Sequence, residues 1–262
     1  MTSLVFPAYN PGPGVDRTWH AVREFLRERP EAWEAIFVLD GCSDGTPERL
    51  EDLSRTAPDS RIRVVSYAPN RGKGHAVRVG LLAARGRYRL FTDVDLAYSF
   101  ADIVNVANAL WSGRRVAIAS REHPDSTLTI PVRHLSYAYR RSVQSRIFRA
   151  VARTLLPLKQ PDTQAGLKGM TATVAEVILP RLSCNGFGFD CEFLTACSRS
   201  NLSIAEIPVA VRYEDSASTT GLGTSLKMLR DLWQIRKAWR QAPAIVLPNE
   251  PEAEAIPSRI AA

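Results

Sequence analysis

The chain has 262 residues, of which 45% are hydrophobic and 23% are charged. This length and apolar content are sufficient for one domain with a buried core, and they exclude a disordered or fibrous protein. The formal net charge of +7 favours an acidic partner, such as a phosphorylated substrate, an anionic membrane face or a nucleic acid.

The first half of the chain alternates short strand patterns with helical patterns. Such alternation is typical of parallel strands joined by crossover helices, and it predicts an α/β fold. We predict strands over residues 3–7, 35–39, 62–67 and 88–92. We predict helices over residues 16–29 and 73–84, and between them a helix with Thr46 as its N-cap and Pro47 as its first residue.

The second half is less regular. We predict strands over residues 116–120, 166–170 and 204–211, and helices over residues 131–153, 173–182, 190–200 and 225–240. From residue 242 onward the sequence is rich in proline and acidic residues. We therefore expect one folded domain over residues 1–241 and a flexible tail over residues 242–262.

Two of the predicted helices are basic and amphipathic. Residues 131–153 contain six arginines and no acidic residue, and residues 225–240 contain five lysines and arginines. Their apolar side chains could bury against the sheet, which is the commoner outcome, or face a lipid surface. The apolar stripes are Leu135, Tyr139, Val143, Ile147 and Val151 in the first helix, and Leu226, Leu229, Trp233 and Ile235 in the second.

The sequence shows no segment that would take the chain across or out of a membrane. No apolar run approaches the roughly 18 to 20 residues that span a bilayer, and residues 1–10 lack a secretory pattern. The four cysteines form no CxxC pair, so we expect reduced thiols and no structural zinc. These features predict a cytoplasmic location, with peripheral association at the inner membrane face as an option.

Polar loops follow each of the first four predicted strands. Their sequences are AYNPGPG (8–14), DGCSDGT (40–46), APNRGKG (68–74) and DVDLAYS (93–99). In open α/β sheets, ligands bind beyond the carboxyl ends of the strands, so these four loops should converge on one edge. Asp93 and Asp95 flank Val94 there. Two such carboxylates can hold Mg²⁺ or Mn²⁺, which would stabilise the charge on a departing diphosphate.

Residues 70–76, NRGKGHA, place two glycines around Lys73 just before a predicted helix. Backbone amides, the helix N-terminus and the lysine could together approach an anion, with Gly74 allowing close contact. The GxxxxGK[ST] spacing of a P-loop is absent, and so is GxGxxG. A simple turn with a solvated lysine is the alternative interpretation.

Taken in order, the four loops resemble glycosyltransferase family 2, which implies the GT-A fold. That fold is a single α/β domain with a mostly parallel central sheet flanked by helices. The later segments are similar to the dolichyl- or polyprenyl-phosphate β-glucosyltransferase branch of the family. The matching segments are FPAYN (6–10), VLDGCSDGT (38–46), NRGKGHA (70–76), FTDVDL (91–96), DTQAGLKGM (162–170), GFGFDCEFL (186–194) and YEDSAS (213–218).

The resemblance implies a role for each matching residue. The expected nucleotide-sugar contacts are Pro7, Ala8, Tyr9 and Asn10 around the nucleobase, Asp40 at the base or ribose, Arg71, Lys73 and Gly74 near the base and phosphates, and Asp93, Val94 and Gln164 around the ribose and donor sugar. Asp95, with Asp93, would hold the metal. Asp190 would act as general base or orient the acceptor, and Asp162 would shape the catalytic pocket.

The need for a base depends on the acceptor. A sugar hydroxyl must lose a proton, so one of the carboxylates would have to remove it. A phosphate monoester, with a second pKa near 6, is already largely dianionic at neutral pH and needs only positioning. Asp190 also falls at the start of a predicted helix, where an acid is favoured simply by the helix dipole.

The resemblance therefore predicts an inverting, metal-dependent transfer of a hexose, with glucose favoured, to a polyprenyl phosphate at the cytoplasmic membrane face. A UDP-sugar is the favoured donor and a GDP-sugar is the alternative. A soluble acceptor remains open, because membrane spans are missing and Ser218 stands where the lipid-phosphate branch often has a Gly-Ser-Lys run. A non-catalytic sugar-nucleotide binding module is the third hypothesis, since Leu39 precedes a single Asp40 where the family commonly has two aspartates. No nucleic-acid-binding motif is visible, so we expect no nucleic-acid partner.

Overall fold

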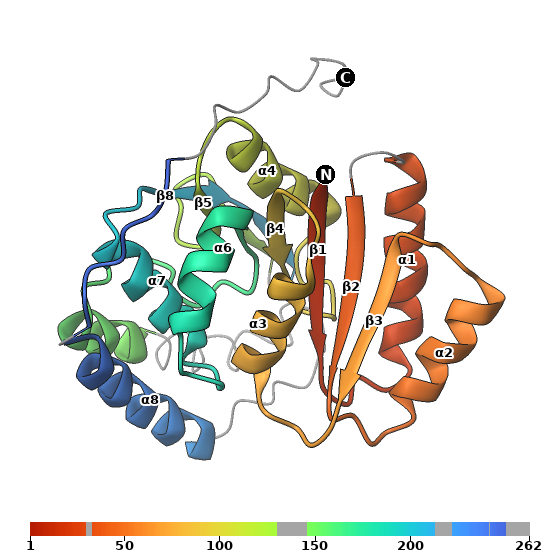
Figure 1. Cartoon of the computed structure of the whole chain (residues 1–262), viewed down its shortest axis with the longest axis horizontal. Coiled ribbons are helices and arrows are strands. Elements are labelled where there is room, and N and C mark those ends of the chain that lie inside the picture. The colour runs from red at the N-terminus through yellow and green to blue at the C-terminus, as the bar shows by residue number, and fades with distance from the viewer. Residues whose placement is uncertain (30–32, 130–145, 213–221, 241, 250–262) are drawn as a thin grey trace.

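The computed structural model describes residues 1–29, 33–129, 146–212, 222–240 and 242–249. A seven-stranded sheet forms its centre, in the order β3-β2-β1-β4-β7-β5-β8 (Figure 1). The strands are β1 (Thr2–Ala8), β2 (Trp33–Asp40), β3 (Ile62–Tyr67), β4 (Tyr88–Phe91), β5 (Val116–Ser120), β7 (Lys168–Thr171) and β8 (Ile204–Pro208). Only β7 runs antiparallel to its neighbours within this sheet, which confirms the predicted mostly parallel α/β architecture.

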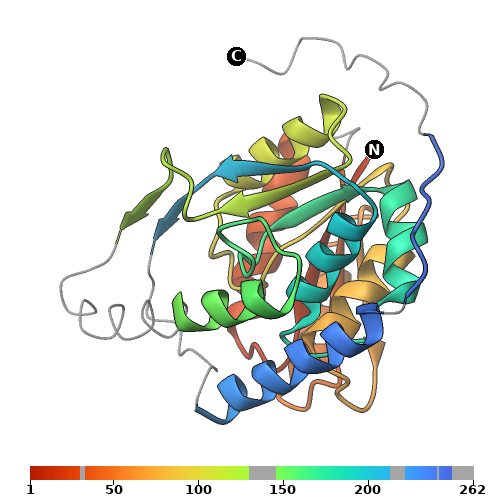
Figure 2. The ribbon, with the colours of Figure 1, turned by 90° about the vertical axis from the view of Figure 1, so that its left-hand side faces the viewer.

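Helices cover both faces of the sheet (Figures 1 and 2). They are α1 (Gly14–Glu28), α2 (Thr46–Thr56), α3 (Lys73–Ala83), α4 (Phe100–Trp111), α6 (Ala172–Ile178), the short 3-10 helix η2 (Leu179–Arg181), α7 (Phe189–Arg199) and α8 (Leu222–Arg240), together with helical residues 146–155. Alternating residues of β1 enter two different cores: Val5 packs with α3, α6 and α7, whereas Leu4 and Phe6 pack with α1 and α4. Burial on both faces explains the continuous apolar runs of the central strands.

A glycine brings α3 close to the sheet. A Cβ added to Gly80 would lie 2.3 Å from Cγ1 of Val5 and 2.8 Å from Cγ2 of Val38. Because no such atom fits, this position requires glycine, and α3 can lie directly over β1 and β2. The approach fixes the height of the α3 N-terminus relative to the carboxyl ends of these strands, where the polar loops are found.

Two helix starts differ from their prediction. Gly45, not Thr46, is the N-cap of α2, and its φ of 79° explains why a residue without a Cβ takes this position. Thr46 and Pro47 form the first turn instead. Helix α4 was missed altogether, although Ser99 and Asp102 form a capping box at its start.

The predicted strand over residues 204–211 is two strands in two sheets. β8 ends at Pro208, and β9 (Ala210–Arg212) pairs with β6 (Thr127–Thr129) in a separate two-stranded sheet. Pro208 has no amide hydrogen to continue a ladder. The next amide, that of Val209, donates to Oγ of Ser126 at 3.0 Å, which carries the chain over to β6.

The buried faces of the two basic helices also differ from prediction. Most of the first, residues 130–145, lies outside the described residues; in the described part, Ile147 is exposed, which is the less common of the two outcomes expected for this stripe. A spacing of four advances about 40° per step around a helix, so a strict stripe rotates away from the core. α8 buries Leu232, Ile235 and Trp239 and leaves Leu229 and Trp233 exposed.

The segment after α8 is packed in its described part. Residues 242–249 run in an extended conformation along the molecule (Figure 2), and Ile245 is only 4% exposed. Arg199 donates to the carbonyl of Ala242 at 2.8 Å, and Arg115 donates to the carbonyl of Pro248 at 3.2 Å. The prediction of a loose tail from residue 242 therefore does not hold for residues 242–249, and residues 250–262 lie outside the described part.

No helix in the described part of the chain combines the length and the apolar character needed to cross a membrane. The parallel strands β1 to β4 end at one edge of the sheet, at the bottom in Figure 1. β5 runs in the same direction as β4, because both are antiparallel to β7. The loops after all five strands therefore meet at this edge.

Candidate active site

The loops after β1 and β2 are tied to each other. Oδ1 of Asn10 accepts from the amide of Ser43 at 2.8 Å, and Oδ2 of Asp44 accepts from the amide of Gly12 at 2.6 Å. Asn10 has a φ of 49°, an uncommon conformation that asparagine tolerates well. Tyr9 stands exposed between these loops, while Pro7 and Ala8 are buried in β1. Tyr9 thus offers an aromatic surface at the edge.

Asp40 shapes the loop that follows β3. Its buried carboxylate accepts from Nδ2 of Asn70 at 2.9 Å, from the amide of Arg71 at 2.7 Å and from the amide of Gly72 at 2.8 Å. A carboxylate that accepts several hydrogen bonds is held firmly in one orientation. Here Asp40 positions residues 70–72, and its contact with a base or ribose stays a prediction.

The N-terminus of α3 is already occupied by protein. The amide of Gly74 donates to the carbonyl of Asn185 at 2.8 Å, and the amide of His75 donates to the carbonyl of Gly72 at 3.0 Å. A Cβ on Gly72 would lie 2.4 Å from the Asn185 carbonyl oxygen, and one on Gly74 would lie 2.6 Å from Cβ of Phe189. These glycines admit the segment before α7, and the amides of Gly74 and His75 are engaged within the protein. Contact of residues 71–74 with the donor phosphates stays a prediction.

Lys73 provides a positively charged side chain at the start of α3. Its Nζ lies 2.5 Å from Oδ1 of Asp93. Burial by itself lowers the pKa of Lys73, but the carboxylates of Asp93 and Asp190 more than offset this, and the pKa is raised. Lys73 therefore stays protonated at neutral pH. The loops after β3 and β4 meet through this ion pair, as the convergence of strand ends predicts.

Asp93 and Asp95 lie just past the end of β4. Partial burial raises the pKa of Asp95, and the negative charge of Asp93 raises it further. Oδ1 of Asp95 accepts from the amide of Ala97 at 3.1 Å, and the carbonyl of Val94 accepts from Oγ1 of Thr18 at 2.6 Å, which fixes the loop. A carboxylate whose pKa is raised by a neighbouring carboxylate suits a cation, which would relieve the repulsion between the two negative charges.

Within the described residues, no group of three or more His, Cys, Asp or Glu side chains forms a metal cage. A site of the magnesium type needs only one or two carboxylates, which share the ion with substrate phosphates and water. The residues that could hold such an ion are Asp93 and Asp95.

A buried ion pair that the sequence did not reveal lies behind this loop. Lys168, on β7, has no solvent exposure, and its Nζ donates to Oδ1 of Asp190 at 2.7 Å and to the carbonyl of Ala165 at 2.5 Å. Asp190 belongs to the first turn of α7. A lysine in the middle of an apolar strand was the available signal, because an unpaired charge there would be costly.

The turn before β7 touches the carboxylate pair. A Cβ on Gly166 would lie 2.2 Å from Oδ2 of Asp93, so only glycine fits. The amide of Gly166 donates to Oη of Tyr98 at 3.3 Å. Burial raises the pKa of Tyr98 to about 12, so this hydroxyl stays protonated. The Ala165 carbonyl on the same turn is held by Lys168. The turn that precedes β7 therefore packs directly against Asp93 of the carboxylate pair.

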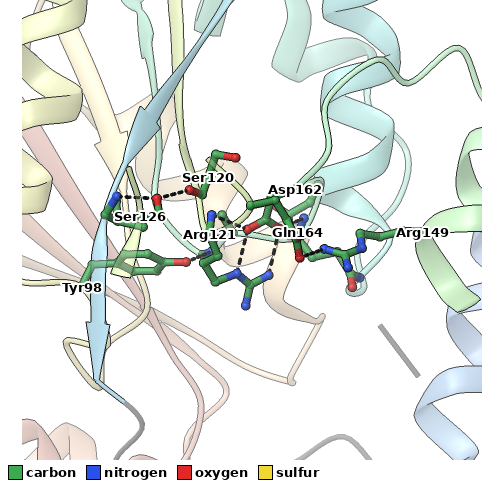
Figure 3. Close-up of polar contacts among 12 residues, drawn as sticks. Tyr98, Ser120, Arg121, Ser126, Arg149, Asp162 and Gln164 are labelled. Carbon is green, nitrogen blue, oxygen red and sulfur yellow. Dashed lines mark hydrogen bonds and ion pairs between the residues drawn. The ribbon is translucent and has the colours of Figure 1, made fainter. Parts of the chain in front are cut away.

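Arg121, which the sequence reasoning also missed, pairs with Asp162 (Figure 3). Its Nε and Nη2 donate to the two carboxylate oxygens at 2.7 and 2.9 Å, and its amide donates to Oδ2 at 2.9 Å. Burial raises the pKa of Asp162, but the hydrogen bonds and charge of Arg121 lower it to about 2. Asp162 is therefore too weak a base to take a proton at neutral pH. The signal was Arg121, a basic residue directly after the fifth strand.

The predicted site residues fall into two groups along one edge. One group contains Lys73, Asp93, Asp95 and Asp190. Lys73 forms an ion pair with Asp93, and the carboxylates of Asp93 and Asp190 raise its pKa. The negative charge of Asp93 also raises the pKa of Asp95. Asp162 and Gln164 lie beside Arg121 and Tyr98, and the amide of Gln164 donates to Oδ1 of Asp162 at 3.3 Å (Figure 3). The edge thus combines a carboxylate pair for a cation with two fixed cations for anionic groups.

Comparisons with known proteins agree with this geometry. The family model described as "Glycosyl transferase family 2" matches residues 3–179. A dolichyl-phosphate beta-glucosyltransferase of Dictyostelium discoideum is 30% identical over 244 residues, covering 89% of this chain and 73% of the relative. Glycosyltransferase AglD of Haloferax volcanii is 30% identical over 242 residues, covering 89% of this chain and 37% of the relative.

Solved structures show the same fold. Glucosyl-3-phosphoglycerate synthase of Mycobacterium tuberculosis, in complex with Mn²⁺, uridine diphosphate and glucosyl-3-phosphoglycerate, superposes with a TM-score of 0.62. The alignment covers 90% of this chain and 80% of the synthase, at 18% identity. Another crystal structure of the synthase gives a TM-score of 0.63 at 19% identity. At these identities the likeness bears on the fold, and it confirms the predicted GT-A architecture.

Proposed function

Because this chain belongs to glycosyl transferase family 2 and is a glycosyltransferase, we propose that it transfers a hexose from a nucleotide diphosphate sugar to a polyprenyl phosphate. Glucose is the favoured sugar and UDP the favoured carrier, with a GDP-sugar as the alternative donor. Relatives named for dolichyl-phosphate glucosyl transfer support the sugar and the acceptor. The observation that carries the proposal is the Asp93–Asp95 pair, held beside Lys73 at the carboxyl edge of the sheet.

Asp93 and Asp95 would hold the Mg²⁺ or Mn²⁺ that the reaction needs. The raised pKa of Asp95 supports this assignment, since two neighbouring carboxylates are more stable with a cation than alone. When bound, the ion supplies positive charge that stabilises the departing diphosphate. Lys73, which stays protonated, adds a second positive charge on the same side.

The donor nucleotide would lie across the loops after β1 and β2. Tyr9 offers its exposed ring to the base, with Pro7, Ala8 and Asn10 beneath it. Asp40 orients the backbone of Arg71 and Gly72 toward the same region. Val94, whose carbonyl is fixed by Thr18, lies next to the carboxylate pair and would contact the ribose.

The acceptor phosphate would approach Arg121. The side chain of Arg121 is partly exposed while that of its partner Asp162 is buried, so Arg121 would present its remaining donors to an anion. An oxygen of the phosphate dianion would bond to the anomeric carbon as the bond from that carbon to the diphosphate breaks, with inversion. No proton has to be removed, which suits a site in which Asp162 has a pKa of about 2. Asp190, paired with Lys168, would orient the reactants.

Transfer of radiolabelled glucose from UDP-glucose to a polyprenyl phosphate, followed by organic extraction, tests the proposal. We expect extractable label with Mn²⁺ or Mg²⁺, and loss of that label after chelation or with Asp95→Asn. Label found only in water-soluble product would reject the lipid acceptor in favour of a soluble phosphate. Binding of UDP-glucose without turnover toward any acceptor would favour a non-catalytic binding module.

A further inference from the structure

Helix α8 has one face fixed against the protein. Leu232, Ile235 and Trp239 are buried in the core that also contains α3, α6 and α7. The indole nitrogen of Trp239 donates to Oε1 of Glu192 at 3.1 Å. This hydrogen bond and the three buried side chains set the rotation of the helix about its axis. They therefore decide which residues must face outward.

The outward face of α8 is both apolar and basic. Trp233 is 59% exposed and Leu229 is 38% exposed, although both are large and apolar. Lys237 and Arg240 continue the same line at spacings of four and three residues, which places them on one side of a helix. Nζ of Lys237 lies 5.7 Å from the centre of the Trp233 ring. We call Leu229, Trp233, Lys237 and Arg240 the α8 outer face.

The α8 outer face carries uncompensated positive charge. In the described part of the chain, no carboxylate forms an ion pair with Lys237 or Arg240. Contact with the Trp233 ring and a position in the last turn of α8 each stabilise such a charge only modestly, and neither neutralises it. The combination is instead the one found where a helix lies at the boundary of a membrane.

α8 borders the active-site edge. A Cβ on Gly188 would lie 2.7 Å from Cβ of Asp231, so the segment before α7 touches α8 directly. The same segment supplies the Asn185 carbonyl that receives the amide of Gly74, next to Lys73. In the described part of the chain, this segment thus contacts both α8 and the start of α3, which carries Lys73. A surface bound by α8 would therefore lie beside the site where transfer takes place.

The neighbouring helical segment extends this face. Residues 146–155 lie alongside α8 in both views (Figures 1 and 2), and Nη1 of Arg236 lies 3.5 Å from the carbonyl oxygens of Thr154 and Leu155. Ile147 on that segment is exposed. Its apolar side chain would add to any contact made by Leu229 and Trp233.

We propose that the α8 outer face docks the enzyme on the surface of an anionic lipid bilayer. Trp233 and Leu229 would enter the headgroup region, while Lys237 and Arg240 would meet lipid phosphates. The proposal rests on the proposed function, since a polyprenyl phosphate is presented at such a surface. Docking here would hold the active-site edge against the membrane. The enzyme would then search for its acceptor by diffusion along the membrane surface.

Vesicle flotation of the whole protein measures the docking. The probes are vesicles of phosphatidylcholine alone and vesicles that contain one third phosphatidylglycerol. We expect the wild-type protein to float with the anionic vesicles and to be released by salt. Each basic side chain near an anionic surface contributes about fivefold in binding. Lys237→Gln with Arg240→Gln should therefore weaken binding about thirtyfold, and Leu229→Ala and Trp233→Ala should each weaken it severalfold.

Matched control variants separate the face from general surface properties. Leu82→Ala removes a leucine that is 43% exposed on α3, which is close to the exposure of Leu229. Arg27→Gln with Arg55→Gln removes two exposed charges on α1 and α2, the same change in net charge as in the α8 double variant. Both controls should bind vesicles like the wild type. Equal binding by α8 variants and controls, or no binding to anionic vesicles, would overturn the proposal.

Transfer assays with two acceptors separate this proposal from the proposed function. With a short-chain, water-soluble polyprenyl phosphate, the α8 variants should be as active as the wild type, because the active site is unchanged. With a long-chain acceptor in anionic vesicles, they should lose activity in proportion to their loss of binding. If neither acceptor is used by any variant, the proposed function fails even where docking is observed. If instead Trp233→Ala abolishes a dimer seen by sedimentation while vesicle binding persists, the face binds a second copy and the membrane proposal is wrong.

Discussion

Lys168 and Asp190 form an ion pair in the interior, with 2.7 Å between Nζ and Oδ1. The pair joins the first residue of β7 to the first turn of α7, and through the Ala165 carbonyl it also fixes the turn that packs against Asp93. The turn beside Asp93 and the start of α7 are thus held by the same ammonium group. Several consequences of this arrangement and of its surroundings can be measured.

Lys168→Met should destabilise the protein by about 3 to 5 kcal/mol, because it leaves the Asp190 carboxylate buried without its partner. Urea denaturation at pH 7 measures the free energy of unfolding. The double variant Lys168→Met with Asp190→Leu should recover most of the loss, since both charges are then gone. An unfolding free energy of Lys168→Met equal to that of the wild type would contradict the pairing.

The Arg121–Asp162 pair should make stability depend on pH in a defined window. The pKa of Asp162 is lowered from its ordinary value of 3.8 to about 2. Folding therefore favours the ionised carboxylate of Asp162. This preference adds about 2 kcal/mol to the free energy of unfolding above pH 4, and the contribution is lost as pH falls through 2. Urea midpoints between pH 7 and pH 2 should show this loss in the wild type.

Arg121→Gln removes the cause of that shift. The variant should be less stable at neutral pH, and the acid-dependent part of its stability should be smaller. Arg55→Gln is the matched control, because Arg55 pairs with Asp52 on an exposed helix face, where such pairs contribute little. The same pH profile in Arg121→Gln and in the wild type would show that Asp162 is not held by Arg121.

Asp95→Asn should separate metal binding from folding. Without metal, the variant should be at least as stable as the wild type, because one of two mutually repelling carboxylates is removed. With UDP-glucose and Mn²⁺ at about 100 times the dissociation constant, the wild type should gain about 2.7 kcal/mol, and the variant should gain far less. Thermal shift with and without chelator measures both effects. A full Mn²⁺-dependent gain in the variant would remove Asp95 from the site.

Gly166→Ala should damage catalysis more than folding. The added methyl group would lie 2.2 Å from Oδ2 of Asp93, so either this carboxylate or the turn must move. A displacement of about 1 Å can cost on the order of 100-fold in rate, whereas the overpacking costs about 1 to 3 kcal/mol. Gly14→Ala, where a Cβ meets nothing within 4 Å, is the control and should be neutral. Sugar transfer and urea denaturation of both variants test the difference.

Ile245→Ala should show that the segment after α8 belongs to the folded domain. Ile245 is 4% exposed and packs in the core of α3, α6 and α7, so its truncation should cost about 2 to 5 kcal/mol. Its neighbour Val246 is 83% exposed, and Val246→Ala should have almost no effect. Equal unfolding free energies for the two variants would show that this segment is not packed in solution.

The first half of the fold could be predicted because its signals are local. Strands β1, β2 and β4 are buried throughout, β3 is a half-buried strand at the edge of the sheet, and each of the four ends in a polar loop. Parallel pairing then brings those loops together without any knowledge of distant contacts. Lys73 and Asp93 were placed at one edge for this reason, and their ion pair agrees with it.

The remaining features depend on contacts between distant residues. Nothing near residue 168 in the sequence indicates that β7 inserts between β4 and β5, so the pairing of Lys168 with Asp190 could not be anticipated. The Asn185 carbonyl that occupies the start of α3 is equally remote. The rotation of α8 was misjudged because Leu229, Trp233 and Trp239 are all apolar, and only packing decides which of them are buried. Helix α4 is different, since its capping residues were legible in the sequence.

The placement of β7 has a consequence for how the polypeptide emerges from the ribosome. β4 pairs with β1 on one side, and its other side pairs with β7, which is translated much later. Until residues 168–171 leave the exit tunnel, the nascent chain presents an unpaired β4 margin, which is a template for adventitious strand addition. When β7 enters the sheet between β4 and β5, it therefore also covers this unpaired edge of β4.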